Sequence, residues 1–376
     1  MPSVIDLQAI GDAPGAAETI ARCLREGGRV GLPLECSYGV AFLPGAAPES
    51  SSELFSETPL DDRPIGILAF RDVAAVRDLA GRLPGRSGRL LDRGWPGSMI
   101  VELAGLPAGS PVEQMSAGVR NLVGGDSRVR LNVPRHPLFR AVLRHVPGPL
   151  AVALPDFQSE PVRTATALSA RHSRGLEILV DDGPLRYDQP AACVFIQGEE
   201  WRLLAEGVPS AKAIQRMAGE IILFICTGNT CRSPMAEALC RRLLSGRLGC
   251  ADDELIDHGF AVMSAGLAAP SGAPASPEAV ELLDAQGVDL HGHESQMVTR
   301  DLLERADRII AMTRAHRETI IRELPELEDR VRVLSVEGGD ISDPIGGGPH
   351  EYRQCCEQIA DNLRQLVEEI LPAGHR

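Results

Sequence analysis

Cys226 and Arg232 are separated by five residues, in the stretch Cys226-Thr-Gly-Asn-Thr-Cys-Arg232-Ser233. A loop of this length between a strand and a helix can turn successive backbone N–H groups inward. Such a nest at a helix N-terminus binds a phosphate dianion. Gly228 and Asn229 suit the left-handed backbone positions that the loop needs. The phosphate-binding residues predicted from this segment are Thr227, Gly228, Asn229, Thr230, Cys231 and Ser233.

The same segment can carry covalent phosphoryl transfer. Cys226 lies at the base of the loop, where the positive potential favours a nucleophilic thiolate. The planar guanidinium of Arg232 can hold two oxygens of the transferring group, and Ser233 can donate a hydrogen bond to the thiolate. The alternative is a buried cysteine before an ordinary turn. The apolar strand before it and Pro234 in the first turn of the next helix argue against that alternative.

Phosphoryl transfer to a thiolate also needs a general acid, because the leaving group otherwise departs as a strong base. Asp343 is the best candidate, since it precedes a proline and a glycine-rich loop that can bring a carboxylate over a pocket. An aspartate that only starts a turn before proline is the alternative for Asp343. Asp340 is its chief competitor for the acid role.

Strands that alternate with helices must position these residues. In the second half, an apolar strand is expected at 221–226, directly before the loop, with a helix after it. Further helices are expected at 276–287, 299–306 and 351–371, and further strands at 307–313 and 330–336. This order implies an α/β fold, with a doubly wound parallel sheet covered by helices on both faces.

The first half is expected to be a separate α/β or α+β domain. Strands are predicted at 29–34, 65–70, 98–103, 128–134, 150–154, 176–182 and 192–197, with helices at 16–27 and 136–145. A short helix at 208–220 closes this unit. The predicted domains are therefore 1–217 and 218–376, which agrees with a chain of 376 residues.

Composition limits the environment and the partners. The net charge of −14 argues against a general role in binding nucleic acids. The start of the chain lacks the pattern of a signal peptide, and no apolar run is long enough to span a membrane. We therefore expect a cytoplasmic protein whose nine cysteines are reduced. No metal site is expected at the adjacent Cys355 and Cys356, which face different ways on a helix.

The region from Glu220 to Leu371 resembles the low-molecular-weight protein phosphatase family. The resemblance rests on LFICTGNTCRSPMAEA, MSAGL, DRIIAMT and DPIGGG, in the family's order and spacing. It implies a four-stranded parallel sheet, with Cys226 as nucleophile, Arg232 as phosphate clamp and Asp343 as general acid that later activates water. It also implies that Ser264 supports Asn229, and that the reaction uses a phosphocysteine intermediate and no metal or other cofactor.

Within that family, the loop CTGNTCRS resembles the protein arginine phosphatases, where tyrosine-directed members carry an aliphatic residue at the position of Thr230. Ile345 after the Asp-Pro pair departs from both groups, since an aromatic residue is usual there. The resemblance implies a phosphorylated protein as partner, with phosphoarginine as the substrate. Phosphotyrosine and arsenate or another small phospho-substrate are the alternatives.

Cys231 has a second candidate role. It lies in the loop five residues after Cys226, so that a disulfide between the two would switch the enzyme off reversibly and protect the thiolate from further oxidation. The alternative is that Cys231 is a small core residue.

Residues 17–210 resemble the YrdC-like family, whose active members make threonylcarbamoyl-AMP for tRNA modification. The matching stretches are 27–42, 65–70, 95–103, 129–138 and 181–195, in which Trp95, Pro96 and Gly97 are interpreted as fold elements. The chain departs from the family at functional positions, namely Pro33-Leu34-Glu35-Cys36, the segment 54–64 with only Arg63, Leu154-Pro155-Asp156, and Ala192-Cys193.

These departures bear on the cofactor. Synthesis would require ATP and Mg²⁺, and a triphosphate site needs cations, yet Lys212 is the only lysine of the chain. The sequence therefore favours a degenerate domain that no longer synthesises and instead binds a nucleotide ligand, a tRNA-like partner or a substrate protein. A bifunctional synthase and phosphatase acting in tRNA modification is the alternative.

Overall fold

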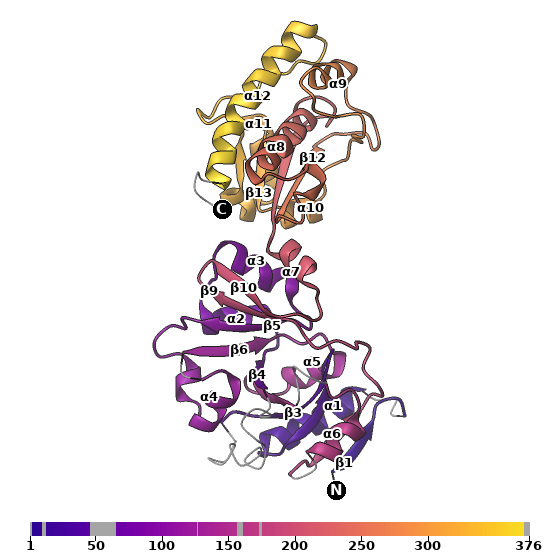
Figure 1. Ribbon diagram of the computed structural model, residues 1–376, viewed down its shortest axis with the longest axis vertical. Helices are drawn as coiled ribbons and strands as arrows, with labels where there is room; N and C mark the ends of the chain where they lie inside the picture. The colour runs from indigo at the N-terminus through magenta and orange to yellow at the C-terminus, as the bar shows by residue number, and fades with distance from the viewer. Residues whose placement is uncertain are drawn as a thin grey trace. The chain divides into compact units, whose positions relative to one another are not determined.

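The computed structural model describes residues 2–9, 13–45, 65–125, 127–155, 161–172 and 175–371. The chain divides into two compact units, Met1–Ala218 and Gly219–Arg376 (Figure 1). Of the positions singled out in the sequence, the segment 54–64 with Arg63, as well as Asp156, lies outside the described residues.

The first unit contains a mixed sheet and seven α-helices among its described residues. Its strands are β1 (Ser3–Asp6), β2 (Val30–Pro33), β3 (Tyr38–Phe42), β4 (Ile65–Ala69), β5 (Ile100–Ala104), β6 (Arg128–Asn132), β7 (Leu150–Leu154), β8 (Ile178–Asp181), β9 (Cys193–Gln197) and β10 (Glu200–Ala205). Its helices are α1 (Ala13–Arg25), α2 (Val73–Ala80), α3 (Gly85–Gly94), α4 (Ala117–Val123), α5 (Pro137–Arg144), α6 (Ala165–Arg171) and α7 (Ala211–Ala218), with a 3₁₀ turn η3 (Pro111–Gln114).

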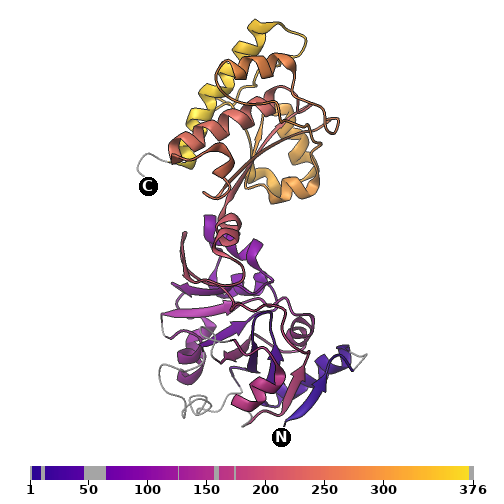
Figure 2. The ribbon, with the colours of Figure 1, turned by 45° about the vertical axis from the view of Figure 1, so that its right-hand side comes forward.

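The strands of this unit follow the order β1-β8-β2-β3-β7-β4-β6-β5-β9-β10. Helices α1 and α5 pack on one face, where Ile20 and Phe139 are fully buried (Figures 1 and 2). Helices α2, α3, α4 and α7 bury Val76, Leu90 and Val119 against the other face. The seven predicted strands are present, whereas β1, β3 and β10 were not predicted. β10 alternates exposed and half-buried residues at the sheet edge, so its sequence lacks an apolar run.

The second unit holds a parallel sheet whose strands follow the order β12-β11-β13-β14. Its strands are β11 (Glu220–Cys226), β12 (Phe260–Gly266), β13 (Arg308–Ala311) and β14 (Val331–Val333). Its helices are α8 (Arg232–Leu248), α9 (Pro277–Asp284), α10 (Arg300–Arg305), α11 (Arg314–Glu323) and α12 (Pro349–Ile370), with 3₁₀ turns η4 (Asp252–Glu254) and η5 (Pro325–Arg330).

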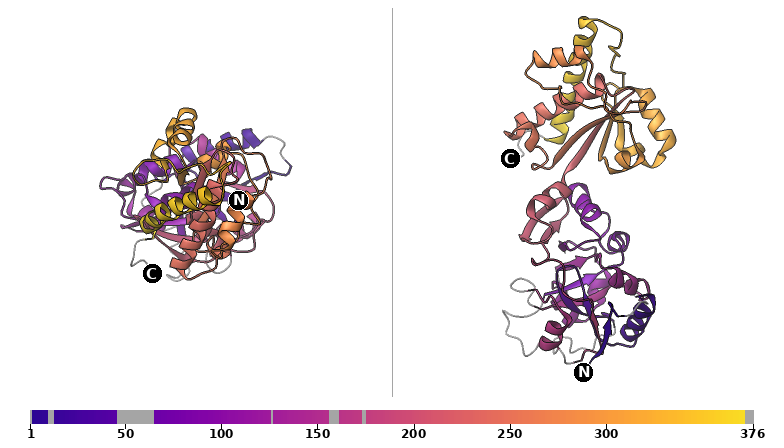
Figure 3. Two further views of the ribbon diagram at one scale, coloured as in Figure 1. Left: turned by 90° about the horizontal axis from the view of Figure 1, so that it is seen from above. Right: turned by 90° about the vertical axis from the view of Figure 1, so that its right-hand side faces the viewer.

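Both faces of this sheet are covered, as Figure 3 shows in its right-hand view. Helices α8, α9 and α12 bury Ile222 and Phe224 on one face. Helices α10 and α11 bury Leu223 and Ile225 on the other, which explains the unbroken apolar run of β11. The predicted α/β fold with a doubly wound parallel sheet is thus confirmed for this unit.

The strand order determines where a site can form. The chain passes from β11 to β12 on one side and then to β13 on the other, so the sheet reverses its winding beside β11. Ligands of such sheets bind in the crevice at the carboxyl ends of the strands where this reversal occurs. Cys226 is the last residue of β11 and lies at that edge. Among the described residues, none of the helices combines the length and apolar character that a membrane span requires.

Candidate active site

The loop from Cys226 to Ser233, here called the phosphate loop, joins β11 to α8 and curls around the cysteine sulfur. The Cys226 side chain is buried, and its Sγ lies 2.9 Å from the Ser233 hydroxyl. The Asn229 backbone N–H donates to the same sulfur at 3.2 Å. The Ser233 hydroxyl and the Asn229 backbone N–H therefore both lie within hydrogen-bonding distance of the sulfur.

Asn229 holds the loop in shape from inside. Its backbone is left-handed, with φ of 54°, and it is fully buried. Its amide donates to the hydroxyls of Ser233 and Ser264, at 3.0 and 2.8 Å. Its Oδ1 accepts from the Gln296 backbone N–H at 2.9 Å, and its backbone oxygen lies 2.7 Å from Nε2 of His293. The Asn229 side chain and backbone oxygen thus have partners on three separate segments.

The loop retains unused backbone donors. Among the described residues, the N–H groups of Gly228, Thr230 and Cys231 have no hydrogen-bond acceptor. Donors at the start of a helix that lack partners form an anion-binding concavity. The predicted loop residues are therefore placed so that an oxyanion can lie above the Cys226 sulfur.

Gly266, from the MSAGL stretch, permits this close packing. A Cβ at this position would lie 2.5 Å from the Thr227 carbonyl oxygen and 2.9 Å from the Asn229 nitrogen, closer than side chains tolerate. Ser264, two residues earlier in β12, also donates to Glu237 of α8 at 2.6 Å. The end of β12 therefore supports the loop with both backbone and side chain.

Arg232 and Asp343 are brought into contact from positions far apart in the sequence. The Arg232 side chain is only 7% exposed, and its Nη2 lies 2.5 Å from Oδ2 of Asp343. Asp343 is 46% exposed, and its other oxygen accepts from the Ile345 N–H at 3.2 Å in a tight turn. The competing Asp340 instead accepts from the Arg314 N–H at 2.8 Å and so caps α11. Only Asp343 of the two contacts the loop arginine.

The Cys231 thiol contacts two hydroxyl groups. Its Sγ lies 3.4 Å from the Tyr352 hydroxyl and 3.6 Å from the Thr230 hydroxyl, and the side chain is buried. Burial, together with the hydrogen bond to Cys231, raises the pKa of Tyr352 to about 12. Burial also raises the pKa of Cys355 to about 12, so that this neighbouring thiol stays protonated.

A histidine that the sequence analysis did not single out also reaches the loop. His316 in α11 is buried, with Nε2 2.9 Å from the Thr227 hydroxyl and Nδ1 2.9 Å from the Thr313 hydroxyl. Burial lowers its pKa, as does the nearby Arg232 cation, while Asp343 and Asp340 act in the opposite direction. The sequence did offer a signal for His316, because Thr313 and His316 follow directly after the apolar stretch of β13. Residues after neighbouring parallel strands lie at the same edge of the sheet, here beside the end of β11.

The first unit contains a small cavity. Four residues that depart from the YrdC-like pattern, Leu34, Glu35, Cys36 and Leu154, belong to its lining. The cavity has a volume of about 20 Å³, enough for one water molecule. Its lining is mostly apolar and consists of Leu34, Glu35, Cys36, Ser37, Ile67, Ser98, Ile100, Asn132, Leu154 and Ala191. Burial raises the pKa of Cys36 to about 12, so its thiol is protonated at neutral pH.

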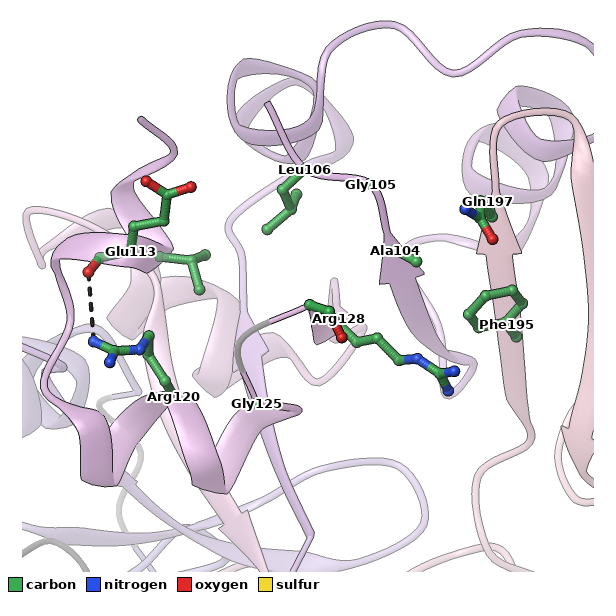
Figure 4. A pocket seen from close by; sticks show the side chains of 11 residues that line it. Ala104, Gly105, Leu106, Glu113, Arg120, Gly125, Arg128, Phe195 and Gln197 are labelled. Atoms are coloured by element: carbon green, nitrogen blue, oxygen red, sulfur yellow. Dashed lines mark hydrogen bonds between the residues drawn. The ribbon is translucent and has the colours of Figure 1, made fainter. Parts of the chain in front are cut away.

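A larger pocket of about 440 Å³ lies at the end of β5 in the same unit (Figure 4). Leu106 and Phe195 supply apolar surface, and the Arg128 guanidinium lies 5.0 Å from the Phe195 ring centre. Arg120 donates to the Glu113 carbonyl oxygen at 3.4 Å. This pocket shares no lining residue with the small cavity at Cys36, so the two are distinct.

Residues 221–373 match the family described as low molecular weight phosphotyrosine protein phosphatase. The protein-arginine-phosphatase of Bacillus subtilis is 39% identical over 153 residues, which are 40% of this chain and 95% of that protein. A probable low molecular weight protein-tyrosine-phosphatase, EpsP, of Ralstonia nicotianae is 36% identical over 41% of this chain and 97% of its own.

A solved structure, that of a YwlE mutant from Bacillus subtilis, covers 40% of this chain and 99% of its own at 36% identity and a TM-score of 0.36. The sequence relatives are matched over nearly their whole length at more than 30% identity. The chain therefore belongs to the low molecular weight phosphotyrosine protein phosphatase family and is a cysteine-based hydrolase homologous to arginine and tyrosine phosphatases.

Proposed function

We propose that the second unit removes the phosphoryl group from phosphoarginine in proteins, through a phosphocysteine intermediate. The observation that supports this most directly is the set of unused N–H donors around the buried Cys226 sulfur, with Arg232 bridging to Asp343. In this proposal Cys226 is the nucleophile, Arg232 the phosphate clamp and Asp343 the general acid.

In the first step the Cys226 thiolate attacks phosphorus in line, and an S–P bond forms as the P–N bond to the guanidinium breaks. Asp343 gives its proton to the departing nitrogen. In the second step Asp343 removes a proton from water, whose oxygen attacks phosphorus. The P–S bond breaks and inorganic phosphate leaves, with Ser233 donating to the restored thiolate at the 2.9 Å contact.

Charge stabilisation by the loop is expected to be the largest catalytic contribution. The N–H donors of the loop are held in place before substrate arrives, and the almost fully buried Arg232 has only to exchange Asp343 for the phosphoryl oxygens. Fixed donors in a site sheltered from water lose little energy to reorganisation as charge develops on the phosphoryl oxygens. Phosphate binding would draw Arg232 from its contact with Asp343 toward the phosphoryl oxygens, freeing the carboxyl group to serve the leaving group.

Two residues near the site, Thr230 and Ile345, support specificity for phosphoarginine. Thr230 is half-buried and polar, where an aliphatic residue would suit a phenol ring. Ile345, beside Asp343, is 66% exposed and offers no ring for stacking on phenol. The relative with 39% identity is named a protein-arginine-phosphatase, which agrees with this assignment.

Replacing Thr230 with isoleucine should shift this preference. The added apolar bulk narrows the loop and removes a hydroxyl, and such differences in a pocket are worth about 10-fold or more. We expect the ratio of kcat/KM for a phosphoarginine peptide to that for a phosphotyrosine peptide to fall by about this factor in T230I, while T230S retains it. An unchanged ratio in T230I would show that Thr230 does not set specificity.

We further propose that the first unit is a degenerate YrdC-like domain that does not synthesise threonylcarbamoyl-AMP. The small cavity at Leu34, Cys36 and Leu154 supports this, because about 20 Å³ among the described residues holds a water molecule and not a nucleotide. The larger pocket of about 440 Å³, lined in part by Arg120, Arg128 and Phe195, is large enough to bind a ligand.

The synthase assay can be made on the full chain. With threonine, bicarbonate, ATP and Mg²⁺, we expect no release of pyrophosphate above the rate without threonine. The described residues that line the cavity include no cation to bind a triphosphate. Threonine-dependent release of pyrophosphate, retained in Cys226→Ser, would establish the bifunctional alternative.

A further inference from the structure

His316 is a buried base whose two ring nitrogens both meet threonine hydroxyls. Nδ1 lies 2.9 Å from Oγ1 of Thr313, and that same Oγ1 accepts the His316 backbone N–H at 3.2 Å. Nε2 lies 2.9 Å from Oγ1 of Thr227. The ring therefore links the first residue of the phosphate loop to the N-cap of α11 and is fixed from both ends.

The charge and the tautomer of His316 together decide the direction of its hydrogen bonds. The charged groups that face it are Arg232 of the phosphate loop and Asp343 and Asp340 of the loop before α12. Burial and the Arg232 cation together lower the pKa of the ring, so it is neutral at pH 7. A neutral ring has one donor and one acceptor nitrogen, and a protonated ring has two donors.

The direction of the hydrogen bond between His316 and Thr227 affects the substrate through the Thr227 hydroxyl. It follows the nucleophile directly and is exposed, while Cys226 and Arg232 are buried. In the neutral tautomer with its proton on Nδ1, that nitrogen donates to Oγ1 of Thr313 and Nε2 accepts from the Thr227 hydroxyl. Both lone pairs of the Thr227 oxygen are then left for an incoming group. A guanidinium carries only N–H donors, whereas an aryl ester oxygen carries none. An oxygen held as an acceptor therefore suits a guanidinium leaving group.

We propose that His316 is a positioning residue that holds the Thr227 hydroxyl as a hydrogen-bond acceptor for the guanidinium N–H of phosphoarginine. This inference rests on the proposed function and extends it to a second specificity element beside Thr230. When His316 is protonated, both ring nitrogens donate. Nε2 then donates to the Thr227 oxygen, and the Thr227 O–H must point elsewhere. The preference for phosphoarginine should then decline.

The test compares a phosphoarginine peptide with p-nitrophenyl phosphate, using the ratio of the two kcat/KM values. Because a net hydrogen bond is worth up to about 10-fold, Thr227→Val and His316→Ala should each lower this ratio by about 10-fold at pH 7.5. The double variant should lower it no further than either single change, since both remove one interaction. Thr227→Ser, which keeps the hydroxyl, should recover the wild-type ratio.

The pH dependence of the same ratio provides a second measurement. In the wild type the ratio should fall as pH drops below 6.5 toward the lowered pKa of His316, where the ring gains its proton. His316→Gln, whose amide can accept from Thr227 and does not titrate, should keep the ratio constant over that range. A decline of equal size in His316→Gln would overturn the role of the ring.

The outcomes separate this inference from the proposed function. A wild type that hydrolyses p-nitrophenyl phosphate but not phosphoarginine would overturn the arginine assignment itself, and this inference with it. A wild type that prefers phosphoarginine, with the same preference in Thr227→Val and His316→Ala, would overturn the inference alone. Equal losses on both substrates would have the same meaning, because they indicate a purely structural role for the two side chains.

Discussion

Substituting Cys226 with serine should abolish turnover, lowering kcat for p-nitrophenyl phosphate and for phosphoarginine peptides by roughly 10⁴-fold or more. A serine hydroxyl is far less ionised than a thiol at neutral pH and is a much weaker nucleophile without a neighbouring base. Steady-state assays on both substrates measure the effect. Arg232 and the loop N–H donors remain, so the variant should still bind inorganic phosphate.

Cys250→Ser is the matched control for this result. Cys250 is half-buried in the same unit, just after α8 and away from the phosphate loop, and the substitution is chemically identical. We expect wild-type turnover in Cys250→Ser and thermal unfolding of both variants within about 3 °C of the wild type. Turnover in Cys226→Ser close to that of Cys250→Ser would mean that the sulfur is not the nucleophile.

Replacing Asp343 with asparagine should have the next largest effect. Removal of a general acid lowers the rate by about 10²–10⁴-fold, and asparagine cannot supply the proton that the leaving group needs. The loss should be greater for phosphoarginine than for p-nitrophenyl phosphate, because p-nitrophenolate departs readily without protonation. Single-turnover rates on the two substrates provide the comparison.

The neighbouring carboxylate offers the control. Asp340 bonds to Arg314 at the start of α11, whereas Arg232 pairs with Asp343. Asp340→Asn should therefore change turnover by less than about 3-fold while lowering stability slightly. If Asp340→Asn removed activity and Asp343→Asn did not, the roles assigned to the two aspartates would be reversed.

Much of the second unit follows from local sequence pattern. The apolar run of β11, the loop with Gly228 and Asn229, and Pro234 inside the first turn of α8 each carry a local signal. The predicted strand at 330–336 is shorter in the structure, where β14 covers only Val331–Val333. In the first unit the predicted strands are present, while α2, α3, α4 and α6 were missed because they are short and, in α3, rich in glycine and arginine.

Side-chain partners from distant segments lay beyond such reasoning. His293 and Gln296 meet Asn229 across more than 60 residues of sequence, and His316 meets Thr227 across 89. Their own neighbourhoods show only polar loop residues or a helix start. Each becomes part of the site because several segments end at the same edge of the parallel sheet.

The sequence by itself predicted the reactive groups, since a cysteine and an arginine five residues apart on a strand–loop–helix indicate a phosphate-binding loop with a nucleophile. Only the tertiary structure decided which aspartate contacts Arg232 and which histidine contacts the Thr227 hydroxyl. The physical reason is that hydrogen bonds and ion pairs act over about 3 Å in space, whatever the separation along the chain. Sheet order and helix packing, and not local pattern, determine which groups come that close.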